Sequence, residues 1–262
     1  MYKILIYFLV FSSSLLAYID SDMDGVIDKN DKCKNTLLTD LVDLSGCSVK
    51  SLVSFQHFDI LLGKSYSTDK SSNLTLSSIT LDYYYKVWSL QLSSSFYEIS
   101  ANRQISMGMN DTYVNISYLF QAFENFYLKF TGGIVFPTYN SNDNNIDYST
   151  SLYGRYTRDK FSFIVEFGYG KIGDRNKDNI VSYNNTFSYS TSIGYTWNKK
   201  LYTSISYNQS NSVFKGSDNL KILSLYGYYS INQHWFSTIN YRHGFLSVGS
   251  RKSVGVNIGY YW

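Results

Sequence analysis

The amino-acid sequence predicts an all-β protein: a transmembrane antiparallel β-barrel of about twelve strands, preceded by a short calcium-binding segment. Three observations lead to this prediction. The 262 residues include 27 Tyr and 17 Phe but a single Pro, and this composition favours long uninterrupted strands. From residue 51 onward, segments of about ten residues alternate between apolar and polar side chains. Short turns and longer polar loops alternate between these segments, as is typical of barrels in membranes.

Residues 1–17 are predicted to be a signal peptide. Lys3 precedes an apolar run over residues 4–11, and Ala17 supplies a small residue for cleavage. The run is shorter than the roughly 20 residues of a membrane-spanning helix, so an uncleaved anchor is the less favoured alternative. The rest of the chain is therefore expected to be exported.

Residues 18–50 begin with a pattern of carboxylates that is typical of a calcium loop. Asp residues occupy positions 1, 3, 5, 9 and 12 of a twelve-residue window, and Gly25 at position 6 allows the sharp turn. The expected oxygen ligands are Asp20, Asp22, Asp24, the Val26 carbonyl, Asp28 and Asp31. Calcium is the only cofactor predicted, and a solvated acidic linker without an ion is the alternative.

The chain has two cysteines, Cys33 and Cys47, which an oxidising compartment would join as a disulfide. Closing a loop of this size stabilises by about 3 kcal/mol in the chain-entropy model. Metal ligation or a redox pair is less favoured, because the spacing is not C-x-x-C and no histidines accompany it.

Residues 20–47 as a whole resemble a single thrombospondin type 3 repeat, a module found in linkers of relatives of outer-membrane protein A. The resemblance implies calcium at the six ligands above and a Cys33–Cys47 bridge. The family usually repeats the motif and has Pro after this Cys, where Lys34 stands here. Residues 18–50 carry seven Asp and four Lys, whereas residues 51–262 carry 18 basic and 13 acidic residues. We therefore expect three parts: residues 1–17, 18–50 and 51–262.

Residues 51–262 contain twelve alternating segments. They are 53–67, 73–85, 88–100, 111–123, 126–138, 147–157, 161–171, 185–197, 201–211, 219–231, 235–246 and 252–262. Short turns are expected at 86–87, 124–125, 158–160, 198–200 and 232–234, and longer loops at 69–72, 101–110, 140–146, 172–184, 212–218 and 247–251. An even strand number places both barrel ends on the short-turn side, which is periplasmic in outer-membrane barrels. The N-terminal segment is then periplasmic.

The polar faces of these segments distinguish a membrane barrel from a soluble β-sandwich. One face carries Ser89, Gln91, Ser93 and Ser95 in one segment, and Ser188, Ser190, Ser192 and Gly194 in another. A sandwich packs its large apolar face inside, whereas a membrane barrel turns that face toward lipid. Small polar side chains would make a poor dry core, so the interior is predicted to be a polar lumen.

The four tryptophans agree with this arrangement. Trp88 and Trp235 follow short turns, while Trp197 and Trp262 precede a short turn or the end of the chain. Such placement predicts an aromatic belt at one membrane interface, with a tryptophan core in a soluble protein as the less favoured alternative. The last segment, with Tyr260 and Trp262, also resembles the terminal signature of bacterial outer-membrane proteins. That resemblance implies the outer membrane as the location and its lipid as a partner.

Strand alternation assigns seven ionisable side chains to the lumen. They are His57, Asp59, Asp82, Lys129, Arg155, Glu166 and Arg242. Because ionised groups away from bulk solvent require water or a partner, these residues either line a pore or form a plug of internal ion pairs. Strand pairing through the turn at 158–160 does not place Arg155 opposite Glu166.

Two functional classes remain open. The first is a passive pore for small hydrophilic solutes, and the second is a non-conducting structural or adhesin-like surface barrel. No enzyme is predicted: outer-membrane phospholipases and lipid A deacylases carry a Ser close after a His, whereas Ser247 follows His243 by four residues. A net charge of +3 gives no basic field that would favour nucleic acid.

Overall fold

The computed structural model describes residues 31–33, 40–42, 45, 47–51, 56–69, 71–101, 104–139, 144–174, 182–245 and 251–262. The chain divides into two compact units, Met1–Ser54 and Phe55–Trp262. The predicted signal peptide and the predicted calcium ligands Asp20, Asp22, Asp24, Val26 and Asp28 lie outside the described residues. The described residues contain no helix long and apolar enough to cross a bilayer.

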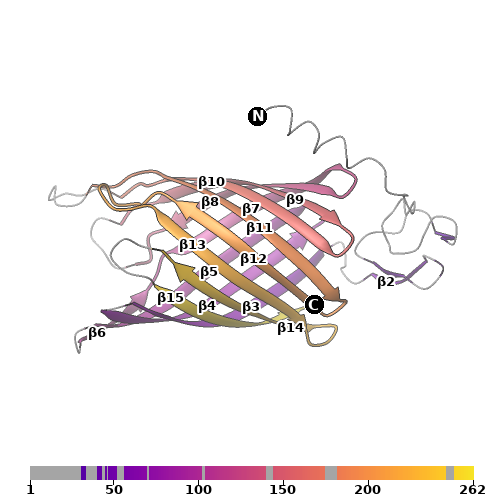
Figure 1. Cartoon of the computed structure of the whole chain (residues 1–262), viewed down its shortest axis with the longest axis horizontal. Coiled ribbons are helices and arrows are strands. Elements are labelled where there is room, and N and C mark those ends of the chain that lie inside the picture. The colour runs from indigo at the N-terminus through magenta and orange to yellow at the C-terminus, as the bar shows by residue number, and fades with distance from the viewer. Residues whose placement is uncertain are drawn as a thin grey trace. The chain divides into compact units, whose positions relative to one another are not determined.

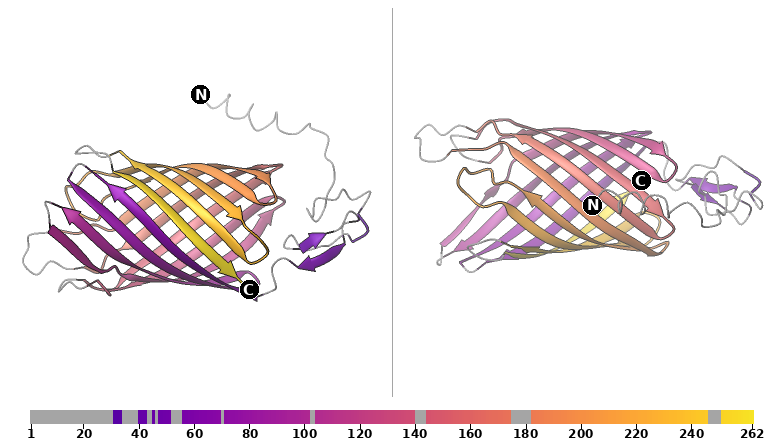
Figure 2. Two further views of the ribbon diagram at one scale, coloured as in Figure 1. Left: turned by 90° about the horizontal axis from the view of Figure 1, so that it is seen from below. Right: turned by 45° about the horizontal axis from the view of Figure 1, so that its top comes forward.

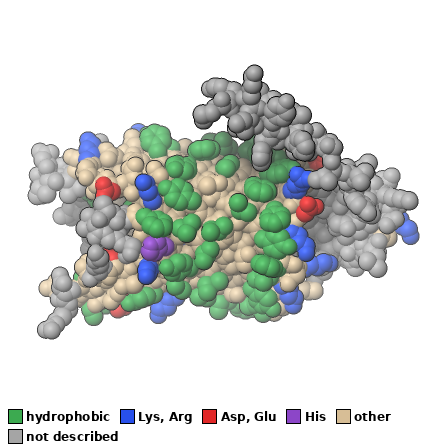
Figure 3. Space-filling view, viewed as in Figure 1, with side chains coloured by type: hydrophobic (Ala, Val, Ile, Leu, Met, Phe, Trp, Pro, Cys, Tyr) green, Lys and Arg blue, Asp and Glu red, His purple; other side chains and the backbone are tan. Residues whose placement is uncertain are grey.

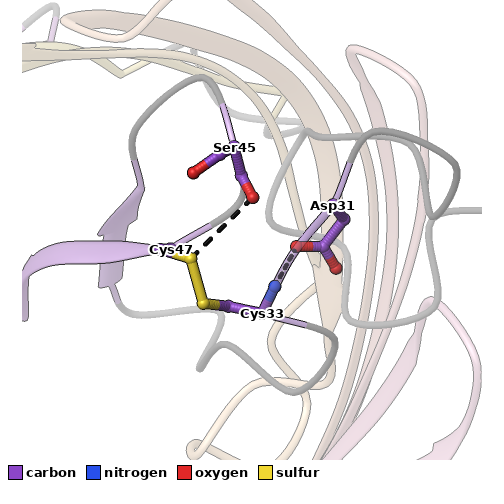
Figure 4. The surroundings of a disulfide bond; sticks show 4 residues. All are labelled: Asp31, Cys33, Ser45 and Cys47. Carbon is purple, nitrogen blue, oxygen red and sulfur yellow. Dashed lines mark hydrogen bonds between the residues drawn. A yellow bond between two sulfur atoms is a disulfide. The ribbon is translucent and has the colours of Figure 1, made fainter.

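The first unit is small and is held together by a disulfide. Strands β1 (Asp40–Val42) and β2 (Ser48–Ser51) pair in antiparallel fashion. The predicted bridge between Cys33 and Cys47 is present, with a Cα–Cα distance of 5.0 Å (Figure 4). Next to it, the backbone N–H of Lys32 donates to the Ser45 carbonyl at 2.8 Å. The bridge therefore links two stretches of chain that one backbone hydrogen bond also holds together.

The second unit is a closed antiparallel barrel, as predicted (Figures 1 and 2). Its twelve wall strands are β3 (Gln56–Thr68), β4 (Ser72–Tyr85), β5 (Trp88–Ala101), β7 (Thr112–Phe123), β8 (Phe126–Phe136), β9 (Asp147–Arg158), β10 (Phe161–Lys171), β11 (Thr186–Asn198), β12 (Leu201–Ser210), β13 (Leu220–Ser230), β14 (Trp235–Gly244) and β15 (Lys252–Tyr261). Strands consecutive along the wall pair with each other, and β15 pairs with β3 to close the cylinder. The predicted segments differ from these bounds by at most three residues at either end.

One further strand was not predicted. Residues 101–110 were expected to form a loop, but β6 (Gln104–Met109) forms there and pairs with the C-terminal part of β5, from Phe96 to Ala101. The N-terminal part of β5, from Trp88 to Ser93, pairs with β7. The prediction was wrong because the apolar alternation of β6 spans only six residues and ends in polar neighbours, so it resembled loop sequence.

Local turn chemistry explains why the short connections are tight. Lys86, Asn125 and Asp159 have φ values of 52°, 62° and 52°, the left-handed region that hairpin turns require and that Asn and Asp tolerate well. At the other two short connections an Asn side chain closes the turn. The Oδ1 of Asn198 accepts from the Lys200 N–H at 2.8 Å, and that of Asn232 accepts from the Trp235 N–H at 2.9 Å. We call this end of the barrel the short-turn end.

The distribution of apolar side chains is the reverse of that in a soluble protein. Among the described residues only Phe236 is a buried hydrophobic residue, whereas Val254, Val256 and Ile258 on the outer face of β15 are 46%, 47% and 50% exposed. Figure 3 shows apolar side chains spread over the outer wall, with Lys and Arg toward its two ends. Such an extensive apolar outer surface requires lipid as its solvent.

The four tryptophans occupy the predicted belt. Trp88, Trp197, Trp235 and Trp262 are 48%, 55%, 44% and 54% exposed, and each lies at the short-turn end. Trp88 packs against Tyr118 and Trp235 against Tyr260, with ring centroids 4.8 and 4.9 Å apart. An indole ring with an apolar body and an N–H group suits the membrane–water interface. The belt therefore marks one boundary of the apolar band.

Candidate functional site: the barrel lumen

Strand alternation turns every second residue of the wall toward the lumen. Small polar side chains occupy many of these inward positions. On β11 the inward residues Ser188, Ser190 and Gly194 stand opposite Gly168, Glu166 and Ser162 of β10. On β5 the inward side chains form a hydrogen-bonded row with their neighbours. Gln91 Nε2 donates to Asp82 at 2.8 Å, and Asn115 Nδ2 donates to the Gln91 Oε1 at 3.2 Å.

At least three cavities open inside the described part of the barrel. The first has a volume of about 510 Å³, lies along β4 to β11 and is bordered by Asp82, Lys129 and Glu166. The second, about 440 Å³, lies against β3, β4 and β13 to β15 and is bordered by Arg242 and Arg251. The third, about 210 Å³, lies against β10 to β13. Each volume exceeds the roughly 30 Å³ that one water molecule occupies in the liquid, so the lumen can hold many waters.

The predicted residues His57, Asp59 and Asp82 come together near the short-turn end. Asp59 and Asp82 stand directly opposite each other on β3 and β4. The His57 ring stacks on Tyr84 with centroids 4.2 Å apart, and its Nε2 lies 3.8 Å from Asp59 Oδ1. Asp82 is 7% exposed and keeps its hydrogen bond from Gln91. Two neighbouring carboxylates thus face the same part of the lumen.

Among the described residues, the other predicted lumen residues form no ion pair with that cluster. Lys129 Nζ lies 5.2 Å from the centroid of the Tyr153 ring. Arg155 stands opposite Ile164 and donates from Nη2 to the Ser162 hydroxyl at 3.2 Å, while Glu166 stands opposite Tyr153. Of the seven predicted lumen residues, only His57 and Asp59 come within ion-pair distance of each other. The ion pairs of the described residues therefore form no plug across the lumen.

An aromatic cluster in the lumen was not predicted. Phe236 is 7% exposed, and its ring centroid lies 5.5 Å from that of Tyr228 and 5.7 Å from that of Tyr261. The ring packs against Gly259, where an added Cβ would overlap it. Phe236 stands opposite Gly259, and both occupy inward positions, but their pairing comes from the register of β14 and β15 and not from a local signal in the sequence. This cluster narrows the lumen on the β13–β15 side.

An ion pair joins two connections at the opposite, long-loop end. Arg251 Nη2 lies 2.9 Å from Asp69 Oδ2. Hydrogen bonds from Arg251 and from the backbone N–H groups of Ser71 and Ser72 hold the pKa of Asp69 well below its usual range. Asp69 therefore stays ionised at neutral and mildly acidic pH, and the pair links the β3–β4 connection to the start of β15.

Only part of the predicted calcium site falls within the described residues. Asp31 is 6% exposed, and its Oδ1 accepts the backbone N–H of Cys33 at 2.8 Å (Figure 4). Its Oδ2 is buried and has no hydrogen-bond partner among the residues that the structure describes. A buried carboxylate oxygen without a partner is unfavourable, so Asp31 fits a cation at Oδ2. Within the described ranges no three His, Cys, Asp or Glu side chains gather into a metal-binding group.

Solved structures share the fold of the second unit. The NanC porin has a TM-score of 0.59 at 12% identity, covering 76% of this chain and 98% of that one. An outer membrane channel from Pseudomonas putida F1 has a TM-score of 0.66 at 10% identity, covering 79% and 95%. The translocator domain of the autotransporter NalP from Neisseria meningitidis has a TM-score of 0.54 at 13% identity, covering 78% and 88%. No protein-family model and no curated protein sequence matches the chain. At these identities the likeness shows the fold: this chain contains a closed barrel of the outer-membrane type.

Proposed function

We propose that the chain is an outer-membrane pore for the passive diffusion of small hydrophilic solutes. The observation that carries the proposal is the cavity of about 510 Å³, bordered by serines, threonines and amides as well as Asp82, Lys129 and Glu166, inside a barrel with an apolar outer wall. Charged groups that are not paired with one another favour water around them. Two of the structures with the same fold are named as a porin and as an outer membrane channel, which adds support.

Twelve strands set the expected size limit. Eight-stranded barrels are filled by side chains, whereas barrels of sixteen strands leave an open aqueous channel. The lumen here lies between these cases, and the cluster of Phe236, Tyr228 and Tyr261 narrows it further. We therefore expect monosaccharides and amino acids to pass more readily than larger oligosaccharides.

Liposome swelling tests this function directly. Liposomes containing the refolded chain should swell in isotonic solutions of small sugars, with rates that fall as the solute grows. Liposomes without protein, and liposomes carrying the same amount of unfolded chain, provide the baseline. Gel mobility confirms that the barrels are folded. If folded barrels cause no swelling above this baseline, the result contradicts the pore and favours the adhesin-like, non-conducting alternative.

The N-terminal part is proposed to be an exported, periplasmic segment stabilised by calcium, after cleavage near Ala17. The buried Asp31 Oδ2 without a hydrogen-bond partner supports a cation at this position. The carboxylate spacing from Asp20 to Asp31 supplies enough oxygens for calcium. The first barrel strand begins at the short-turn end, where Phe58 and Trp262 exchange backbone hydrogen bonds of 3.2 Å. Outer-membrane barrels have their short turns in the periplasm, which supports the proposed side.

Calcium is expected to protect residues 18–50 of the full chain from trypsin. Lys29, Lys32 and Lys34 lie within or beside the predicted loop, so ordering by the ion should slow cleavage there at least tenfold. Cleavage is followed by mass spectrometry with calcium and with a chelator. Asp22→Asn combined with Asp24→Asn should remove the protection, whereas Asp40→Asn, outside the loop, should retain it. Equal cleavage of the unaltered chain with calcium and with chelator would overturn the proposal.

A further inference from the structure

Three adjacent strands present basic side chains on the outer wall at the long-loop end. They are Lys221 on β13, His243 on β14 and Lys252 on β15, and we call them the outer basic patch. Lys252 stands directly opposite His243. The backbone N–H of Phe245 donates to the Lys221 carbonyl at 2.8 Å, so Lys221 lies beside the same end of β14.

Strand alternation places the patch on the lipid-facing side of the wall. The patch shares this face with the apolar residues two positions along each strand: Leu223, Tyr241 and Val254, which are 37%, 37% and 46% exposed. Figure 3 shows a histidine with basic side chains on both sides of it, beside apolar side chains at one end of the wall. The outer surface therefore changes here from an apolar stripe to a cluster of cations and hydrogen-bond donors.

Within the described residues, the three strands that carry the patch supply no countercharge of their own. Strands β13, β14 and β15 contain no Asp or Glu. The ion pairs among the described residues are His57–Asp59 and Arg251–Asp69, so neither Lys221 nor Lys252 takes part in one. His243 and Lys252 stand opposite each other, so their Cβ atoms lie about 4.5–5.5 Å apart and the two groups gain from a shared anion, with Lys221 at the same end of the adjacent strand.

We propose that the outer basic patch binds the phosphate groups of a phosphorylated glycolipid in the outer leaflet. The inference rests on the proposed outer-membrane location, which places the long-loop end at the cell surface. The acyl chains of such a lipid would lie along the apolar stripe of Leu223, Tyr241 and Val254, while its phosphates reach the basic side chains. A soluble phosphate would use only the patch, whereas this surface matches both parts of an amphipathic anion.

Lipid binding by the full chain in detergent, measured by native mass spectrometry, tests the proposal. The two probes are diphosphoryl lipid A and the same lipid A without phosphates, which differ only in the groups that the patch would bind. The unaltered chain should bind the phosphorylated form at least tenfold more tightly. Lys221→Gln combined with Lys252→Gln should weaken that binding roughly 30-fold, since each lysine near an anionic lipid surface contributes about fivefold. Lys221→Arg combined with Lys252→Arg should retain it.

The control removes two lysines from the opposite end of the barrel. Lys199 and Lys200 lie in the turn between β11 and β12 and are exposed, so Lys199→Gln combined with Lys200→Gln changes the net charge equally. This control should bind phosphorylated lipid A within twofold of the unaltered chain. Equal loss in the two double variants, or equal binding of the two lipids by the unaltered chain, would overturn the proposal. Gel mobility confirms that each variant is folded, and liposome swelling reports separately on the pore.

Discussion

Ile205→Arg is expected to lower the free energy of unfolding of the barrel in a bilayer by about 2–4 kcal/mol, the penalty of an Arg on the lipid face near the midplane. Ile205 lies halfway along β12, is 46% exposed, and stands opposite Ile193 and Leu225, which also face outward. The neighbouring change Ser206→Arg should have a much smaller effect. Ser206 faces the lumen between Ser192 and Ser224, where water can solvate the guanidinium.

Denaturant titration of the two variants in lipid vesicles measures this difference, with tryptophan fluorescence as the readout. Placing the same Arg at adjacent positions of one strand keeps chain length and added charge matched. A larger loss for Ser206→Arg than for Ile205→Arg would mean that the apolar face lies inside. That result would contradict the membrane barrel and favour a soluble sandwich.

Phe236→Ala is expected to destabilise the barrel by about 3–5 kcal/mol and to widen the lumen. The Phe236 ring is buried at 7% exposure and packs between Tyr228 and Tyr261. Removing it leaves a space at the short-turn end that water can fill. Unfolding measured in vesicles should show the loss of stability, and liposome swelling should show faster entry of the larger sugars. Unchanged solute cut-off in a folded variant would mean that the cluster does not border the permeation path.

A second substitution separates packing from other effects of losing the ring. A methyl group added at Gly259 would overlap the Phe236 ring, so Gly259→Ala alone should cost about 1–3 kcal/mol through overpacking. In the Phe236→Ala background the same change should be nearly neutral, because the space is then free. Additive effects of the two substitutions would contradict direct contact between these positions.

Strand positions were predictable because their signals are local. Alternation and turn residues such as Asn125 and Asp159 act within a few residues, so the predicted segments agree with the observed bounds to within three residues. The short strand β6 was not predicted because six residues of alternation resemble a polar loop. The aromatic cluster was not predicted for a different reason. Phe236 and Gly259 meet only through the register of β14 and β15, and the long connection between these strands does not specify that register in the sequence.

The same distinction applies to the lumen. Alternation assigns each side chain to a face, and the two-residue turn at Lys86 also sets the pairing of Asp82 with Gln91. The turn at residues 158–160 likewise separates Arg155 from Glu166, as the sequence indicated. By contrast, the stacking of His57 on Tyr84 depends on side-chain torsions, and the meeting of β15 with β3 depends on closing the whole barrel. Neither is encoded in a local pattern.

Single-channel current through cysteine variants of the full chain tests the central claim most directly. The chain has only Cys33 and Cys47, which form a disulfide, so an added cysteine supplies a unique free thiol. Ser190 faces the lumen beside a cavity, while its neighbour Thr191 faces outward. We expect stable unitary steps from both Ser190→Cys and Thr191→Cys, and a bulky charged thiol reagent should reduce the current of Ser190→Cys only. Folded barrels that carry no unitary current, or a current equally affected in both variants, would contradict conduction through the lumen.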